Sequence, residues 1–344
     1  MPRATHLLIA VLAGAAAVTG CGGADDFHGG TTGSASGSTK ATVSLVAYST
    51  PEVVYDEVIP AFKATAPGKA VAFKTSFGAS GEQSRAVEAG LKADVVSFSI
   101  EPDMTRLVKA GLVADDWKAA KYDGQITTSV VSFIVRKGNP KHIRTWADLL
   151  RPGVQVLTPN PFTSGAAKWN LLGAYAAASD GGKDDGAGLA YIDRLLTEHV
   201  KVQDKSGREA LQNFISGNGD VLLSYEYEAK TALKKGEKNI EFVTPDDTMN
   251  IEIDIAKLKD AGPEAQSFID YALSKPGQEG FVDWGYRPVN PEVLAANREK
   301  FPVPPTLRDV EDLGGWSKVN DELFDPEKGA IAKIEEKAGV STAQ

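Results

Sequence analysis

The sequence predicts an α/β protein built as two lobes with a cleft between them. Stretches typical of strands alternate with stretches typical of helices, which predicts a parallel sheet with helices on both faces. This alternation is interrupted by a long β-rich segment at 127–135 and then starts again. We therefore expect two α/β units, joined by extended segments near 127–137 and 243–255. Ligands of such sheets bind beyond the carboxyl ends of the strands.

Each expected strand is a short run of β-branched and other apolar residues, bounded by turn residues. The expected strands are Thr42–Tyr48, Val71–Ser76, Asp94–Phe98, Thr127–Val135, Val154–Thr158, Lys201–Asp204, Gly219–Tyr225, Ile240–Thr244 and Ile251–Ala256. Each expected helix combines apolar residues at helical spacing with flanking Gly, Pro or capping residues. The expected helices are Pro51–Ala64, Gly81–Ala89, Asp103–Ala110, Thr145–Leu150, Ala166–Ala178, Ala187–Glu198 and Arg208–Ile215, with several more towards the C-terminus.

The composition excludes several classes of protein. Hydrophobic residues make up 42% of the 344 residues, which is enough for a proper core. The formal net charge of −9 argues against a nucleic-acid-binding protein, because a phosphate backbone requires a basic face. A single cysteine excludes an intramolecular disulfide and any multi-cysteine metal or iron–sulfur site. The paired acids at 184–185 and 246–247 lack metal-ligand spacing, so we expect neither a metal site nor a cofactor.

The N-terminus is typical of an exported lipoprotein. Arg3 precedes an apolar run that is too short for a usual membrane span, and Val-Thr-Gly stands directly before Cys21. That tripeptide resembles the lipobox of bacterial lipoproteins, which implies that 1–20 is a cleaved signal peptide and that Cys21 is lipidated. Residues 21–41, rich in Gly, Ser and Thr, are predicted to be a flexible tether. The alternative is an ordinary signal peptide with an incidental cysteine.

Four expected helix starts share hydroxyl and glycine residues. They are Ser49-Thr50-Pro51, Ser80-Gly81, Ser164-Gly165-Ala166 and Ser206-Gly207-Arg208. Hydroxyl residues at a helix start commonly cap free N–H groups; Thr50 fits an N-cap, and Ser80 with Gln83 and Ser206 with Glu209 match capping boxes. Repetition with glycine indicates a second role, because small residues let a ligand approach the backbone. Converging N–H groups bind an anion without formal positive charge.

The same motifs limit the kind of anion. Sulfate is fully ionised at neutral pH and only accepts hydrogen bonds, whereas phosphate keeps a proton for part of the time and benefits from a carboxylate acceptor. None of the four starts places an Asp at the cap, which favours sulfate. We expect Glu82 to face water and Glu209 to fold back onto its own backbone, since an inward-pointing Glu82 would repel sulfate.

A longer resemblance lies in the run from 135 to 170. Its most specific segments are Val135–Lys141, Trp146–Leu149, Thr158–Pro161, Ser164-Gly165 and Trp169-Asn170, followed later by Gly219–Leu222, Glu226–Ala229, Tyr286–Pro288 and Gly314–Trp316. From about Thr42 to Phe324, the chain resembles the periplasmic sulfate/thiosulfate-binding proteins of bacterial ABC importers. The resemblance implies a type II periplasmic-binding-protein fold in which each lobe is a mixed, mostly parallel sheet flanked by helices. It also implies that the protein is not an enzyme.

The resemblance further implies a binding site. Proteins of this family hold a desolvated sulfate through backbone N–H groups, serine hydroxyls and an indole N–H. Carried over by motif, the ligand-binding residues are Ser49, Ser80, Ser164, Gly165, Ala166, Gly207 and Tyr225, with Thr50 and Arg208 just behind them. Ser49 replaces a family Asp and Tyr225 replaces a family Trp. These two changes leave thiosulfate, molybdate, tungstate and phosphate open as ligands.

The implied organisation and partners follow. Lobe 1 is expected at 42–127 plus about 250–300, lobe 2 at 128–249, and helices at 301–344 should pack on the lobes. The expected protein is a monomer, anchored through Cys21 to the outer face of the cytoplasmic membrane, that passes its anion to an ABC permease. A sensor or scavenging lipoprotein that never hands over its ligand is a competing hypothesis.

A serine hydrolase is the competing enzyme hypothesis. It would require a base beside its nucleophile. The sequence around Ser80 is Gly-Ala-Ser-Gly rather than Gly-x-Ser-x-Gly. After residue 20 the histidines are His28, His142 and His199; none belongs to a motif, and we expect each at the surface.

Overall fold

The computed structural model describes residues 41–342, which belong to the unit Lys40–Gln344. The predicted signal peptide, the tether through residue 40 and the lipidation site Cys21 therefore lie outside the described residues. Within the described part, no helix combines the length and the apolar character that crossing a membrane would demand.

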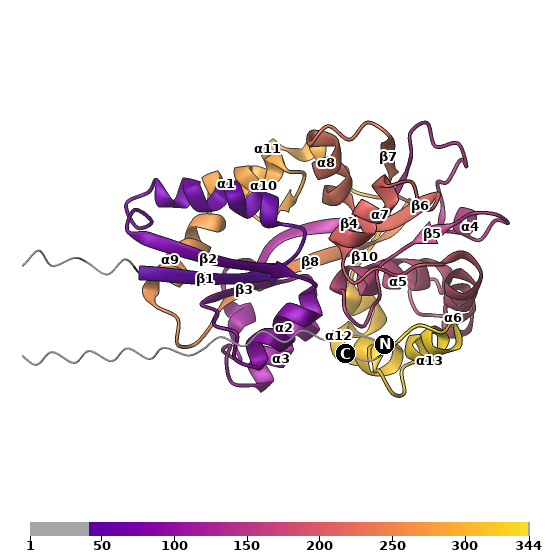
Figure 1. Cartoon of the computed structure of the whole chain (residues 1–344), viewed down its shortest axis with the longest axis horizontal. Coiled ribbons are helices and arrows are strands. Elements are labelled where there is room, and N and C mark those ends of the chain that lie inside the picture. Colours follow the sequence, from indigo (N-terminus) through magenta and orange to yellow (C-terminus); the bar gives the residue numbers. More distant parts are fainter. Residues whose placement is uncertain (1–40, 343–344) are drawn as a thin grey trace, which may run out of the picture. The chain divides into compact units, whose positions relative to one another are not determined.

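The strands of this unit form one mixed sheet, shown in Figure 1. Their bounds are β1 Ala41–Tyr48, β2 Val71–Gly78, β3 Val95–Phe98, β4 Gln125–Arg136, β5 Val156–Leu157, β6 Val221–Tyr225, β7 Ile240–Val243, β8 Asp247–Lys257, β9 Arg287–Pro288 and β10 Thr306–Arg308. The strand order is β2-β1-β3-β8-β4-β6-β5, while β7 and β9 pair with β4 and β10 pairs with β8. Within this order the parallel pairings lie towards the two ends, and β10 adds a parallel pairing to β8. The antiparallel pairings all involve β4 or β8.

Helices cover both faces of the sheet. Their bounds are α1 Glu52–Lys63, α2 Ser80–Glu88, α3 Glu101–Lys109, α4 Trp146–Leu149, α5 Gly165–Ala178, α6 Asp185–Arg194, α7 Gly207–Ile215, α8 Glu226–Lys234, α9 Pro263–Ala272, α10 Lys275–Asp283, α11 Pro291–Ala296, α12 Gly315–Val319 and α13 Ala330–Lys337. In Figure 1, α1 and α10 lie above β1–β3, and α2 and α3 lie below them. The predicted α/β class is confirmed.

Two long strands connect the halves of this sheet. β4 and β8 pair with each other from Gln125 to Val130 and from Asn250 to Asp254. Beyond that region, β8 pairs with β3 through Asp254–Lys257, whereas β4 pairs with β6 through Val131–Val135. The predicted extended connections near 127–137 and 243–255 are therefore confirmed. We call the part built on β1–β3 the first lobe and the part built on β5–β7 the second lobe; the lobe boundaries stay a prediction.

Apolar spacing explains the packing of the helices. Helix α1 buries Val54, Tyr55, Val58 and Phe62, which recur every three or four residues and so share one face. Full burial of one such side chain contributes about 1.5–3 kcal/mol. Helix α5 is instead buried around almost its whole circumference, since it lies between the sheet and α6 and also contacts Trp316 and Asn320 near the C-terminus. This central position fixes the start of α5 firmly in the second lobe.

Two local expectations are wrong. Residues 201–204 form no strand, because the carbonyl of Asp204 accepts the N–H of Asn160 at 2.9 Å and the segment instead supports the loop before α5. His199 is buried rather than on the surface, and its Nδ1 lies 2.9 Å from the carbonyl oxygen of Val154. The turn Leu195–His199 that follows α6 carries this ring inwards.

Glu335 on α13 provides a stability prediction. Its side chain is fully buried, accepts one bond from Gln203 Nε2 at 2.7 Å, and leaves Oε1 without a partner. Burial raises the pKa of Glu335 to about 7. The folded state therefore holds this proton more tightly than the unfolded chain, so the free energy of unfolding should fall as the pH rises from about 4.3 towards 7.

We expect Glu335→Gln to raise the free energy of unfolding at pH 8 by about 1–3 kcal/mol and to change it little at pH 4.5. Urea unfolding at both pH values measures this difference. Glu336→Gln is the matched control, because Glu336 is the exposed neighbour on the same helix. An equal change at both pH values would contradict the assignment.

Candidate functional site

Three helix starts and one strand end lie close together in the cleft. A Cβ on Gly81 of α2 would stand 3.2 Å from the carbonyl oxygen of Thr163, just before α5. A Cβ on Gly165 of α5 would stand 2.3 Å from Ser99 Oγ, directly after β3, and one on Gly207 of α7 would stand 3.6 Å from Ala166 Cβ. The first lobe thus contributes α2 and Ser99, and the second lobe contributes α5 and α7. Glycine at these positions permits the close approach.

Backbone N–H groups without acceptors are the main chemical feature of this region. Ser80 and Gly81 begin α2, Gly165 and Ala166 begin α5, and Gly207 begins α7; all five residues are buried. No described residue accepts a hydrogen bond from any of these five N–H groups. A buried donor without an acceptor costs about 1–3 kcal/mol. The arrangement is therefore suited to a bound group that accepts several hydrogen bonds.

The predicted serine hydroxyls differ in their availability. Ser164 is the N-cap of α5 and is buried, but its side chain makes no capping bond, so its hydroxyl is available to a ligand. The Ser80 hydroxyl instead donates to Asp103 Oδ2 at 2.6 Å and accepts the Ser99 N–H at 3.1 Å. A hydroxyl has one proton, so Ser80 offers a ligand its backbone N–H rather than its hydroxyl in this arrangement.

The capping predictions have mixed outcomes. Ser206 is the N-cap of α7 and accepts the Glu209 N–H at 3.2 Å, as predicted, although the return bond from Glu209 is absent and its side chain is exposed. The capping box at Ser80 is wrong, since Ala79 is the N-cap and Asp103 engages the serine. Thr50 is not an N-cap either, because Pro51 takes that position and Thr50 Oγ1 lies 3.0 Å from Tyr227 Oη.

Tyrosines form one wall of the cleft. Tyr225 is fully buried, its Oη has no hydrogen-bond partner among residues 41–342, and burial raises its pKa well above the usual range. Tyr227 donates to Tyr48 Oη at 2.9 Å and stacks on Tyr286 with ring centroids 3.8 Å apart. These contacts join the end of β1 in the first lobe to the start of α8 in the second. A neutral phenol at Tyr225 supplies one donor to a ligand.

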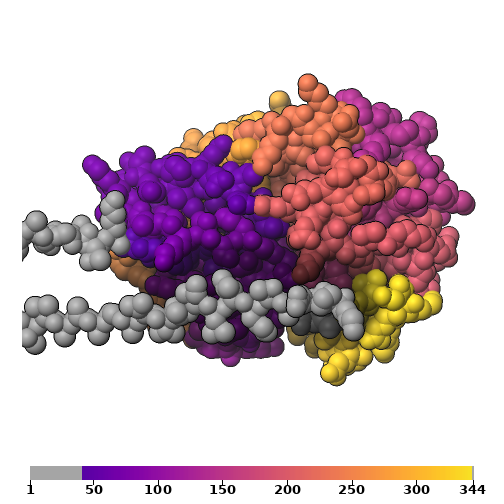
Figure 2. Space-filling view, viewed as in Figure 1, coloured from indigo at the N-terminus to yellow at the C-terminus, as the bar shows by residue number. Residues whose placement is uncertain are grey.

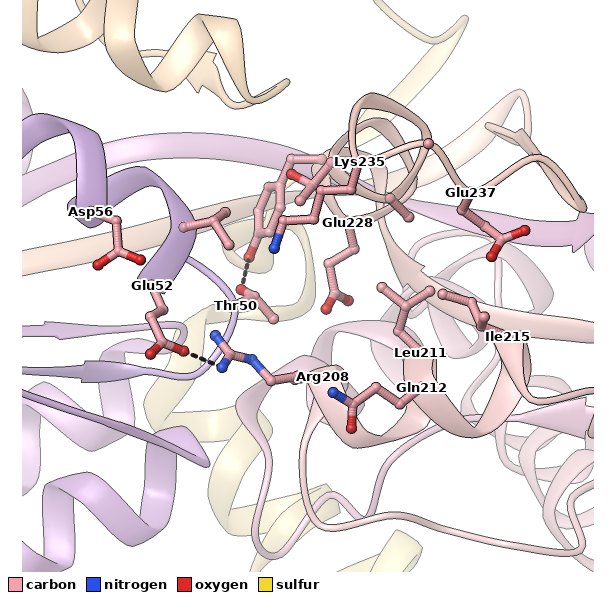
Figure 3. Close-up of a pocket in the computed structure, with 15 residues that line it drawn as sticks. Thr50, Glu52, Asp56, Arg208, Leu211, Gln212, Ile215, Glu228, Lys235 and Glu237 are labelled. Atoms are coloured by element: carbon pink, nitrogen blue, oxygen red, sulfur yellow. Dashed lines mark hydrogen bonds and ion pairs between the residues drawn. The ribbon is translucent and has the colours of Figure 1, made fainter.

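Arg208 links the lobes at the mouth of the cleft. Its guanidinium donates to the Glu52 carboxylate at the start of α1 and to the carbonyl of Ser49, as Figure 3 shows for Glu52. A cavity of about 620 Å³ opens beside this pair, with Thr50, Tyr227 and Glu228 among its lining residues. The positive charge of Arg208 is therefore paired with a carboxylate of the other lobe. The same guanidinium holds Ser49 through its backbone carbonyl. Figure 2 shows the indigo surface of the first lobe in contact with the red surface of the second lobe.

Buried charges of both signs lie behind the helix starts. Asp103 of α3 and Lys168 of α5 are both buried; burial raises the pKa of Asp103 and lowers that of Lys168 to about 8. Lys168 Nζ donates to Asn320 Oδ1 at 2.8 Å. A cavity of about 20 Å³ lies among Asp103, Lys168, Arg85 and Arg106. Glu82 is exposed, 3.9 Å from Lys205, so the prediction that it faces water is confirmed.

Sequence reasoning missed Ser99, Asp103 and Glu228. Ser99 directly follows β3, its carbonyl accepts the Trp169 indole N–H at 2.6 Å, and it lies at the carboxyl end of a parallel strand. The rule that ligands bind at those ends identifies this position. Asp103 is bonded by Ser80 and Ser84, 23 and 19 residues before it, and Glu228 lies against Gly207 of another helix, so their burial has no local signature.

The arrangement offers little to catalysis or metal binding. His142 is exposed, and His199 is bound to a backbone carbonyl outside the cleft. Across residues 41–342, no three His, Cys, Asp or Glu side chains are arranged to hold a metal ion. What converges is a set of hydrogen-bond donors, which suits reversible binding of a small anion.

Comparison with known proteins gives a consistent result. Residues 43–287 match the family model described as bacterial extracellular solute-binding protein. The chain is 36% identical to the sulfate-binding protein of Synechococcus elongatus, over 94% of both chains. It is 32% identical to the thiosulfate-binding protein of Pseudomonas aeruginosa, covering 81% of this chain and 88% of that one. The solved structure of the sulfate-binding protein SubI from Mycobacterium tuberculosis is 47% identical, with a TM-score of 0.81 over 83% of this chain and all of that one.

The contact of Arg208 with the other lobe yields a test. We expect Arg208→Met to weaken anion binding more than Glu52→Gln does, because Arg208 holds both the Glu52 carboxylate and the Ser49 carbonyl. Both side chains are about one-third exposed, so a double-mutant cycle in anion affinity should give a coupling of no more than about 1 kcal/mol. Equal losses in the two single variants would contradict the role assigned to the Ser49 contact.

Proposed function

Because this chain belongs to the family of bacterial extracellular solute-binding proteins, we propose that it captures sulfate or thiosulfate in its cleft and delivers it to an ABC permease. The relatives named above are solute-binding proteins for these two anions, and none is described as an enzyme. The fold, a mixed sheet in two lobes, is shared with the solved structure of SubI.

One observation carries this proposal: buried N–H groups without acceptors begin α2, α5 and α7. Donors alone suit a ligand that only accepts hydrogen bonds, and sulfate and thiosulfate are such ligands at neutral pH. Helix N-termini add favourable dipoles without formal charge. An acidic protein can therefore hold a dianion through neutral donors, with Arg85, Arg106 and Lys168 lining a small cavity beside the starts of α2 and α5.

We assign the binding roles as follows. The backbone N–H groups of Ser80, Gly165, Ala166 and Gly207 donate to the anion, joined by the hydroxyls of Ser164 and Tyr225 and by Ser49. Thr50 and Arg208 hold the lobes together just behind these groups. The lobes, predicted at 42–127 with about 250–300 and at 128–249, close around the anion by bending at β4 and β8.

The remaining parts of the proposal concern location and partners. We propose that the monomeric protein is exported, loses residues 1–20, and is held at the outer face of the cytoplasmic membrane by lipid on Cys21. From there it would meet the membrane subunits of the permease. If sulfate uptake continued unchanged in cells lacking this protein, the sensor hypothesis would be favoured over delivery.

Ligand identity can be measured directly by calorimetry. We expect the purified chain to bind sulfate and thiosulfate, and to bind phosphate, molybdate and tungstate much more weakly. Ser49 and Tyr225 are the reasons to include the whole set, since both differ from the family pattern. Strong phosphate binding without sulfate binding would overturn the argument from acceptor-only chemistry.

Ser164→Ala tests the role of a hydroxyl. We expect it to weaken sulfate binding by about 1–3 kcal/mol, because a charge-assisted hydrogen bond to a desolvated anion is lost. The thermal stability of the Ser164→Ala variant should change little, since the hydroxyl makes no capping bond. Ser216→Ala is the control: that hydroxyl bonds Gln212 at the far end of α7. An unchanged sulfate affinity in Ser164→Ala would exclude the hydroxyl as a ligand.

A further inference from the structure

Glu228 is a buried carboxylate beside the helix starts described above. It is the third residue of α8, and only 3% of it is exposed. Its Oε2 and Oε1 would lie 3.2 and 3.3 Å from a Cβ on Gly207, while Ala166 Cβ would lie 3.6 Å from the same point. The carboxylate therefore stands against the start of α7 and close to that of α5. Figure 3 shows it pointing into the region between α7 and α8.

Hydrogen bonds only partly offset the cost of burying the charge of this carboxylate. The Ser224 hydroxyl and the Tyr225 N–H both donate to it. The second contact is the ordinary role of a Glu at this helix position, which caps its own helix start. Burial is nevertheless the larger effect and raises the pKa of Glu228 to about 7. At neutral pH the group is therefore divided between its neutral and charged forms.

Titratable groups face Glu228 from its own helix and from several other elements. Arg208 of α7 is its nearest cation, but that guanidinium is bound to Glu52 and the Ser49 carbonyl. Tyr48, Tyr225, Tyr227 and Tyr286 face it from β1, β6, its own helix and the segment before β9, and burial raises all their pKa values far above neutrality. Glu52, Asp56, Lys235 and Glu237 line the same cavity. These tyrosines therefore stay neutral between pH 6 and 9, whereas Glu228 changes its charge in that range.

We propose that binding of the oxyanion places a proton on the Glu228 carboxylate, so that sulfate affinity falls as the pH rises above neutrality. The inference rests on the proposed function, because the anion would occupy the donors of Gly207 and Ala166. A dianion and a carboxylate at this spacing repel each other in a desolvated cleft. The proton is taken from the buffer, which neutralises Glu228 and removes that repulsion. Glu228 thus acts as a positioning residue that links anion capture to pH.

Calorimetry in buffers of different ionisation enthalpy measures this proton directly. At pH 8 we expect uptake approaching one proton per sulfate bound, and above pH 7 the sulfate Kd should rise by up to about tenfold per pH unit. Below pH 6 both effects should vanish, because Glu228 is already protonated. Sulfate itself does not titrate in this range, so the proton must be taken up by the protein.

Glu228→Gln should abolish proton uptake and give a flat profile, with sulfate binding at pH 8.5 about ten- to thirtyfold tighter than in the native chain. Ser224→Ala is a second variant with the fold less at risk. It removes a bond that favours the charged carboxylate, so the fall in affinity should begin at a higher pH. Glu335→Gln is the matched control, since Glu335 is buried with a similarly raised pKa but pairs with Gln203 in another part of the fold. It should leave the native profile unchanged.

Each other outcome has a definite reading. Sulfate binding with no proton uptake between pH 6 and 9 overturns this inference and leaves the proposed function standing. Absence of sulfate and thiosulfate binding at every pH overturns both. Lys168, whose pKa burial lowers to about 8, is the competing proton site. A pH dependence that survives in Glu228→Gln but disappears in Lys168→Arg would assign the proton to Lys168 and overturn the role of Glu228.

Discussion

Buried N–H groups left without acceptors are the constraint on which the rest of this structure depends. Each costs about 1–3 kcal/mol in the empty protein, and proteins normally satisfy such groups with capping side chains. Here Ser164 caps nothing and the Ser80 hydroxyl is engaged by Asp103, so the helix starts of α2 and α5 stay open. Small residues at 81, 165 and 207 then allow starts from both lobes to approach one another. A bound anion that accepts hydrogen bonds from these N–H groups removes this free-energy cost.

This arrangement requires two lobes that can separate yet return to one geometry. The paired strands β4 and β8 run through both lobes, so the connection is a short region of antiparallel sheet rather than a loose linker. Contacts made across the cleft differ in kind from that connection. The Trp169 indole donates to the Ser99 carbonyl, Tyr227 to Tyr48, and Arg208 to Glu52. These are polar and partly exposed in the case of Arg208, which suits contacts that form on closure and break on release.

The sequence was informative where a local pattern determines the structure. Periodicity located every helix from α1 to α7 within a few residues, and the two extended segments identified β4 and β8. Glycine beside serine identified the helix starts that meet in the cleft. It could not show that Asp103 would engage Ser80, or that Thr50 would contact Tyr227, because those partners are 23 and 177 residues away. Burial of His199 was missed for the same reason: its partner is the Val154 carbonyl, 45 residues distant.

The net charge of the chain does not describe the charges at the cleft. The chain has a net charge of −9, and buried carboxylates at 103 and 228 stand near the cleft. Lys168, Arg85 and Arg106 face Asp103, whereas the cation nearest Glu228 is committed to the other lobe. The two carboxylates therefore behave differently. Asp103 has cations of both lobes around it, whereas Glu228 loses its charge most readily by gaining a proton. The anion site responds to Glu228 because the cation beside that carboxylate, Arg208, is already bound to Glu52 and the Ser49 carbonyl. Discrimination between anions then depends on which of them tolerates a protonated or an ionised Glu228.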